Sequence, residues 1–211
     1  MQALTIKGWI YLSAPKEELA NKSLQYFDHV VETGEQNGRK YLEAMLGRAK
    51  FFEKFKKYED ALETLSEVAV CFAGFHPAVI EKAKCHIFSG EWDQCIECVT
   101  SIMSFDKQNT EALRIYIFFV LAREGDEELF NEKMDQLVSA LRTIESKNSL
   151  LIYNIARLFA RYSCRKEFVL NRCLELLDMA IMQEPENAAY HAEIGQQKAM
   201  LGDFQAAYES F

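Results

Sequence analysis

A pattern of small and bulky apolar residues recurs every 34 residues along this chain, with equivalent positions at Leu42, His76 and Thr110. The segment that begins at His76 shows the pattern most clearly. Small residues stand at its positions 8 and 20 and bulkier ones at positions 11, 17 and 24, namely Ala83, Cys95, His86, Trp92 and Val99. A fixed period of this length is typical of repeat architectures, in which one unit buries its apolar face only by stacking on its neighbours.

Each 34-residue unit contains two amphipathic stretches separated by a short turn, with small residues where two helices would approach each other. This arrangement is the tetratricopeptide pattern. The sequence therefore predicts an all-α fold, a tetratricopeptide-repeat solenoid in which antiparallel helix hairpins form a right-handed superhelix. We expect a single array over residues 1–211, with six repeats at 1–41, 42–75, 76–109, 110–147, 148–187 and 188–211.

The last repeat is truncated, because the sequence stops within its second helix at Phe211, where position 24 belongs. Terminal repeats normally shield their last apolar face with polar residues. We therefore expect a fragment of a longer solenoid.

Three repeats depart from the pattern. In the first, Gly8 takes the small position, which predicts close helix contact because glycine costs roughly 1 kcal/mol in a helix interior, and Ser13 to Lys16 lengthen the turn. In the fourth, Glu124 to Glu127 end the first helix, and a long second helix is predicted from Leu129, Met134, Leu137, Leu141 and Ile144. In the fifth, Cys164 to Glu167 form an enlarged turn.

The net charge of −8 and a pI near 5.2 argue against a nucleic-acid partner, since phosphate binding normally requires a basic surface. The longest apolar run, Ile115 to Ala122, is less than half of the roughly 20 residues that cross a bilayer. The start of the chain lacks the basic and apolar regions of a secretion signal. We therefore predict a cytoplasmic protein without direct membrane insertion.

Motifs of catalysis are absent from the sequence: it has no glycine-rich phosphate loop, no G-x-S-x-G and no H-E-x-x-H. Cys95 and Cys98 form a lone C-x-x-C, and Cys95 is already explained as the small residue at position 20. We interpret the six cysteines as core residues of a reduced protein. The sequence thus predicts no enzyme, no catalytic residue, no metal site and no cofactor.

The groove lined by the first helix of each repeat is the usual binding surface of such arrays. Its positions 5 and 9 combine apolar residues with a short basic ladder, and we predict contacts there from Trp9, Lys50, Lys84, Arg114 and Phe118. Such a groove would bind a peptide with acidic and apolar residues. The alternative is that its apolar residues pack against helices of the same superhelix.

Several stretches together carry a resemblance to a known family: KGWIYL, YEDALETLSEVAV, EWDQCIE, QNTEALRIYIFFVLAREGD, LIYNIARLFARYSCR and IGQQKAMLGDFQAAYESF. The chain resembles the amino-terminal part of the tetratricopeptide repeat protein 21 family, and of its two paralogues we favour the A form. The most specific part is AREGD followed by a long helix and the enlarged turn at Cys164.

The resemblance implies a non-catalytic scaffold in intraflagellar transport complex A, which carries retrograde traffic in cilia and contributes to cilium assembly. The implied partners are the other subunits of that complex and adaptors for ciliary membrane-protein cargo. The implied location is the cytoplasm, the cilium and its base.

Two other functions fit the same pattern. One is the substrate-recruiting repeat region of an enzyme. The other is a chaperone adaptor, although no run of consecutive repeats supplies the set of Lys, Asn and Arg residues that holds a terminal carboxylate in such domains. All three functions share the fold, so the fold alone does not choose between them.

Overall fold

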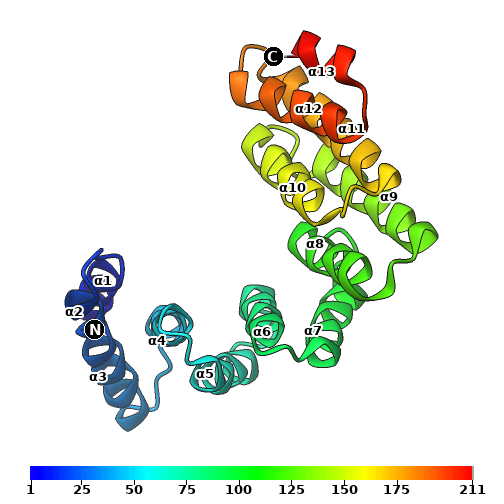
Figure 1. The fold of residues 1–211 in the computed structure, drawn as a ribbon. Helices are drawn as coiled ribbons and strands as arrows, with labels where there is room; N and C mark the ends of the chain where they lie inside the picture. The colour runs from blue at the N-terminus through cyan, green and yellow to red at the C-terminus, as the bar shows by residue number, and fades with distance from the viewer. Residues whose placement is uncertain (211) are drawn as a thin grey trace. The chain divides into compact units, whose positions relative to one another are not determined.

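The computed structural model describes residues 1–210, and within them every regular element is helical: thirteen α-helices and one π-helix. Phe211, predicted at position 24 of the sixth repeat, lies outside the described residues. The chain divides into two compact halves, Met1–Phe105 and Asp106–Phe211, which we describe separately (Figure 1). The predicted division into six repeats of a single array stays a prediction.

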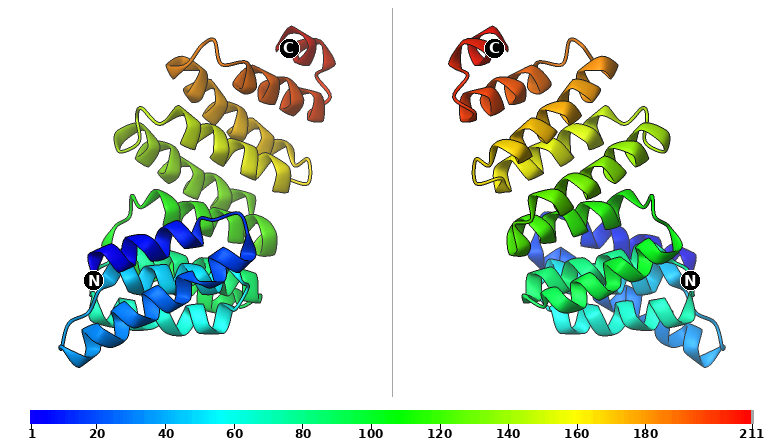
Figure 2. Two further views of the ribbon diagram at one scale, coloured as in Figure 1. Left: turned by 90° about the vertical axis from the view of Figure 1, so that its left-hand side faces the viewer. Right: turned by 90° about the vertical axis from the view of Figure 1, so that its right-hand side faces the viewer.

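The N-terminal half consists of three helix hairpins (Figures 1 and 2). They pair α1 (Gln2–Leu12) with α3 (Ser23–Gln36), α4 (Leu42–Lys54) with α5 (Tyr58–Cys71), and α6 (His76–Ser89) with α7 (Trp92–Phe105). A short helix, α2 (Glu17–Asn21), lies between α1 and α3. Because α3 also packs on α4 and α5 on α6, the hairpins stack through the second helix of one and the first helix of the next.

The C-terminal half repeats this arrangement with more irregular helices (Figure 1). Its elements are α8 (Thr110–Phe119), η1 (Val120–Glu124), α9 (Glu127–Thr143), α10 (Ser149–Tyr162), α11 (Glu167–Gln183), α12 (Ala188–Met200) and α13 (Phe204–Ser210). The hairpin partners are α8 with α9, α10 with α11, and α12 with α13, and α11 also packs on α12.

Phe27 shows why glycine stands at two inward-facing helix positions. Its ring is fully buried between α1 and α4, and a Cβ atom added at Gly8 would lie 2.6 Å from the ring. A Cβ at Gly47 would come closer still. No side chain fits at such separations, so the predicted close approach at Gly8 is confirmed, and Gly47 on α4 serves the same ring.

Asn and Asp residues set the starts of five helices in the C-terminal half. The side chains of Asn109, Asp126, Asn148, Asn187 and Asp203 accept hydrogen bonds of 3.0–3.1 Å from the backbone N–H groups of Ala112, Leu129, Leu151, Ala189 and Ala206. These N-caps satisfy donors that the first turn of a helix leaves unpaired. They explain why α8 and α12 begin at Thr110 and Ala188, the predicted first positions of their repeats.

Several sequence-based expectations need correction. The lengthened turn after α1 is followed by α2 rather than by one continuous second helix, because the chain breaks again at Lys22. Ile144 lies just beyond the end of α9 and is 56% exposed, so it does not continue the buried face of that helix. Glu167 belongs to α11, and the turn before it depends on the left-handed backbone of Cys164 and Arg165, at φ 50° and 60°.

Candidate functional site

The first helices of the hairpins carry the predicted contact residues, and in the N-terminal half two of them meet. The Lys50 ammonium on α4 lies 2.7 Å from the Glu53 carboxylate and also pairs with Glu81 on α6. Lys84 lies 3.0 Å from the same Glu81. The two lysines therefore belong to one ion-pair network, which we call the α4–α6 network, formed by Lys50, Glu53, Glu81 and Lys84.

The electrostatics of this network favour its charged form. Burial alone would raise the pKa of Glu81, but the hydrogen bonds that Lys50 and Lys84 donate outweigh it and hold the pKa below its usual range. Burial opposes the charge of Lys50 as well, and the bonds to Glu53 and Glu81 still raise its pKa. The lysines thus have carboxylate partners within the fold, so an acidic ligand would compete with Glu53 and Glu81 for them.

Trp9 lies in the same half and is partly buried. Its ring meets that of Phe27 edge to face, with the ring centres 5.6 Å apart. In the same half, the Lys54 ammonium on α4 donates hydrogen bonds to the carbonyl oxygens of Leu12 and Ala14, at 2.6 and 3.3 Å. Lys54 therefore satisfies carbonyl groups at the end of α1.

Arg114 and Phe118 lie in the C-terminal half, on α8. Arg114 pairs with Glu111 one turn earlier, at 2.7 Å. The Phe118 ring meets Tyr162 of α10 edge to face, with 5.1 Å between the ring centres. The structure thus brings Lys50 and Lys84 together and gives Arg114 and Phe118 partners of their own. That these five residues contact a ligand stays a proposal.

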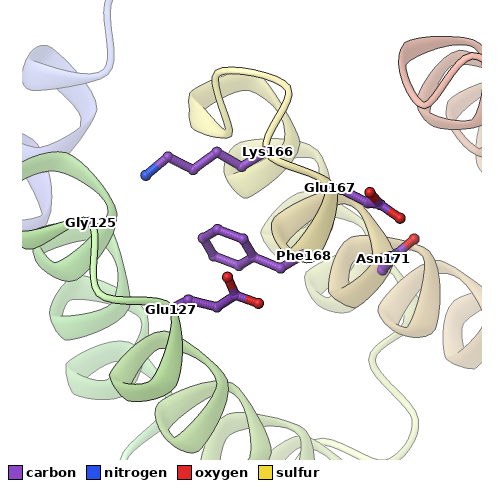
Figure 3. Close-up of a pocket in the computed structure, with 6 residues that line it drawn as sticks. All are labelled: Gly125, Glu127, Lys166, Glu167, Phe168 and Asn171. Carbon is purple, nitrogen blue, oxygen red and sulfur yellow. The ribbon is translucent and has the colours of Figure 1, made fainter.

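A cleft of about 620 Å³ in the C-terminal half was not foreseen from the sequence (Figure 3). It is lined by Gly125, Glu127, Lys166, Glu167, Phe168 and Asn171. In Figure 3 the Phe168 ring lies between the Lys166 and Glu127 side chains, and Lys166 extends toward Gly125. The cleft combines one aromatic ring with charges of both signs and contains no nucleophile paired with a base.

Cys71 and Cys164 are exposed rather than core residues as predicted, and the remaining four cysteines are unsuited to thiolate chemistry. Burial raises the pKa of Cys95 to about 11 and that of Cys173 to about 12, and it raises the pKa of Cys98 as well. A thiol must lose its proton to act as a nucleophile or metal ligand. In residues 1–210, no group of three or more His, Cys, Asp and Glu side chains could hold a metal ion.

The histidine at position 11 of the third repeat packs as predicted. His86 is buried, and its Nδ1 atom lies 2.7 Å from a Glu91 carboxylate oxygen. The pair joins the last turn of α6 to the residue before α7.

The part of the chain that the structure describes also contains no helix long and apolar enough to span a membrane.

The stacked hairpins define the class of protein. The chain is similar to the crystal structure of yeast Tom70, with a TM-score of 0.70 at 12% identity over 99% of this chain and 41% of that one. At this identity the likeness concerns the fold alone. It confirms the predicted class: an all-α array of helix hairpins of the tetratricopeptide type.

Two family models identify the family. "Tetratricopeptide repeat protein 21 N-terminal ARM repeat" matches residues 1–96, and "Tetratricopeptide repeat protein 21 second ARM domain" matches residues 132–211. The chain belongs to the tetratricopeptide repeat protein 21 family, as the sequence resemblance indicated.

Individual relatives agree with this assignment. Human tetratricopeptide repeat protein 21B is 33% identical over 98% of this chain, and human 21A is 25% identical over 92%. The chain spans about 15% of the length of each of these relatives. The higher identity to 21B does not support the preference for the A form.

Proposed function

We propose that the protein is a non-catalytic scaffold of intraflagellar transport complex A that acts in retrograde ciliary transport and cilium assembly. The observation that carries this proposal is family membership, which rests on two family models over separate parts of the chain. On this proposal the protein resides in the cytoplasm, in the cilium and at its base. Its partners are the other subunits of the complex and adaptors for ciliary membrane-protein cargo.

The geometry supports a scaffold rather than an enzyme. On the first-helix face, the ion pairs of the α4–α6 network join neighbouring hairpins. Stacked hairpins of this kind present extended surfaces for protein partners. The buried thiols, with their raised pKa values, offer no nucleophile.

The first experiment is affinity purification of the full-length protein from ciliated cells. We expect the other complex A subunits to be recovered with it. Recovery of chaperones instead would favour the adaptor alternative, and recovery of a catalytic partner set would favour an enzyme-associated array. Either result in place of complex A would contradict the proposal.

A test of whether Lys50 and Lys84 contact a partner in the groove requires a variant that preserves their ion pairs. Replacing the lysines alone by Glu would place four carboxylates together and would disturb folding as well as binding. A variant with all four charges inverted (K50E, E53K, E81K, K84E) keeps every pair and the net charge. If a partner binds these lysines, its recovery should fall by about tenfold or more, whereas unchanged recovery would exclude contact at this network.

A further inference from the structure

Helix α10 in the C-terminal half carries positive charge and no negative charge. Its charged residues are Arg157 and Arg161, and its sequence contains no Asp or Glu. The chain as a whole has a net charge of −8, so the charge of this helix is opposite in sign to that of the chain. One side of α10 is buried, through Ile152, Ile155, Ala156, Phe159 and Ala160.

The opposite side of α10 combines apolar and arginine side chains. Leu150 and Tyr162, near the two ends of the helix, are 60% and 54% exposed. Asn154 and Arg161 are exposed between them, and Arg157 is partly exposed. Residues three and four apart in a helix are neighbours on its surface, so these five side chains lie along one exposed side. We call them the α10 face.

The two arginines differ in how far the fold satisfies their charge. The Arg157 Nε atom lies 3.8 Å from a carboxylate oxygen of Glu193 on α12, and the Arg157 side chain is 43% exposed. Arg161 forms no ion pair with any residue in the range 1–210. The α10 face therefore presents positive charge that the rest of the described chain only partly neutralises.

Neighbouring helices hold aromatic rings on both flanks of the α10 face. Tyr162 meets Phe118 of α8 edge to face, at 5.1 Å between the ring centres. On the other flank, the Tyr153 ring lies 5.0 Å from that of Tyr190 on α12. Rings fixed in this way lose little conformational freedom on binding, and Tyr and Arg are enriched among the residues that dominate binding energies. The α10 face thus has the composition of a protein-binding surface.

We propose that the α10 face binds an acidic segment of a partner protein. Carboxylates of the segment pair with Arg161 and compete with Glu193 for Arg157, and an apolar side chain of the segment packs on Tyr162. Charge complementarity selects the acidic partner. A membrane surface or a nucleic acid is also anionic, but two arginines on a chain of net charge −8 supply too little positive charge for either. The inference goes beyond the scaffold proposal, because it holds whichever complex contains the protein.

The test places a photo-crosslinking amino acid at Asn154, in the middle of the α10 face, in the full-length protein in ciliated cells. We expect an adduct with another protein, at a segment that carries acidic residues beside the linked position. An adduct with a lipid, a nucleic acid, a second copy of the chain or a segment without acidic residues would overturn the proposal. A yield no higher than with the same amino acid at Ser139, an exposed position of α9, would also overturn it.

A charge variant makes the test quantitative. With the crosslinking residue in place, Arg161→Glu should reduce the yield of the adduct about tenfold or more, because it turns an attraction into a repulsion. Arg161→Lys keeps the charge and should retain most of the yield. Lys147→Glu makes the same change of charge at an exposed position before the other end of α10 and is the matched control.

Thermal unfolding of the Arg161→Glu variant should match that of wild type, because Arg161 is exposed and forms no ion pair in residues 1–210. A loss of adduct with unchanged unfolding therefore reports binding. An unchanged yield with Arg161→Glu, or an equal loss with Lys147→Glu, would contradict the assignment of the α10 face.

Discussion

At the scale of single residues, the packing around Phe27 decides how α1, α3 and α4 meet. We expect Gly47→Val to lower the free energy of unfolding by about 1–3 kcal/mol, the usual cost of overpacking, because its Cβ would overlap the Phe27 ring. Urea unfolding measures the change. Glu43→Val places the same side chain at an exposed position of α4 and should cost less. Equal effects of the two substitutions would refute the close contact.

The ion pairs of Glu81 make the stability of the folded protein depend on pH in a defined direction. Its pKa in the folded protein lies below the ordinary value of 4.5, so its ion pairs stabilise the fold above that value and are lost as the pH falls through the folded pKa. We expect Glu81→Gln to cost about 1 kcal/mol at neutral pH, a modest value because Lys50 and Lys84 are part-exposed. The difference from wild type should shrink as the pH falls below 4.5 through the lowered pKa of Glu81.

Denaturant unfolding at several pH values measures this dependence. Glu63→Gln, at an exposed position of α5, is the control and should show little difference at any pH. A cost of Glu81→Gln that is independent of pH would mean that the pairs do not stabilise the charged carboxylate.

At the scale of elements, the register of the 34-residue repeat explains why the π-helix η1 forms. The left-handed residue that ends the first helix stands at position 15 in three repeats, as Lys56, Gly90 and Gly202. In the fourth repeat the equivalent Gly125, at φ 68°, stands at position 16. A π turn accommodates one extra residue in an α-helix, so η1 absorbs this insertion.

Deletion of Ala122, an exposed residue of η1, should therefore be tolerated, because it restores position 15 to Gly125. The expected change in the free energy of unfolding is below about 1 kcal/mol. Deletion of the exposed Ser89 at the end of α6 moves Gly90 out of position 15 and should cost more. Circular dichroism melting compares the two deletions, and the opposite order would contradict the origin given for η1.

The N-cap of α10 provides a simpler test at this scale. Asn148→Ala removes the acceptor for the Leu151 N–H group and should cost about 1 kcal/mol. Asn154→Ala changes the same residue type at an exposed interior position of α10 and should be neutral or slightly stabilising. If the two variants melt alike, the cap does not set the start of the helix.

At the scale of the whole molecule, the sequence predicted the helices well where the 34-residue register holds. α4, α6, α8 and α12 begin at Leu42, His76, Thr110 and Ala188, the first positions of their repeats. It failed where one residue is inserted, as in η1, and where the chain breaks locally, as before Ser23. The position of Gly125 one residue late was the signal that would have located η1.

The candidate site was predicted only in part. The repeat register placed Lys50 and Lys84 at the same position of the first helices of two neighbouring repeats, and the structure brings them into one ion-pair network. Their carboxylate partners depend on the distance between α4 and α6, which periodicity does not specify, so Glu81 was missed as the shared partner.

The most direct test of the scaffold proposal is live imaging of the labelled full-length protein together with a labelled complex A subunit in cilia. We expect the two proteins to enter cilia and to move along them together. A protein that stays outside cilia, or that moves independently of the complex A subunit, would contradict it.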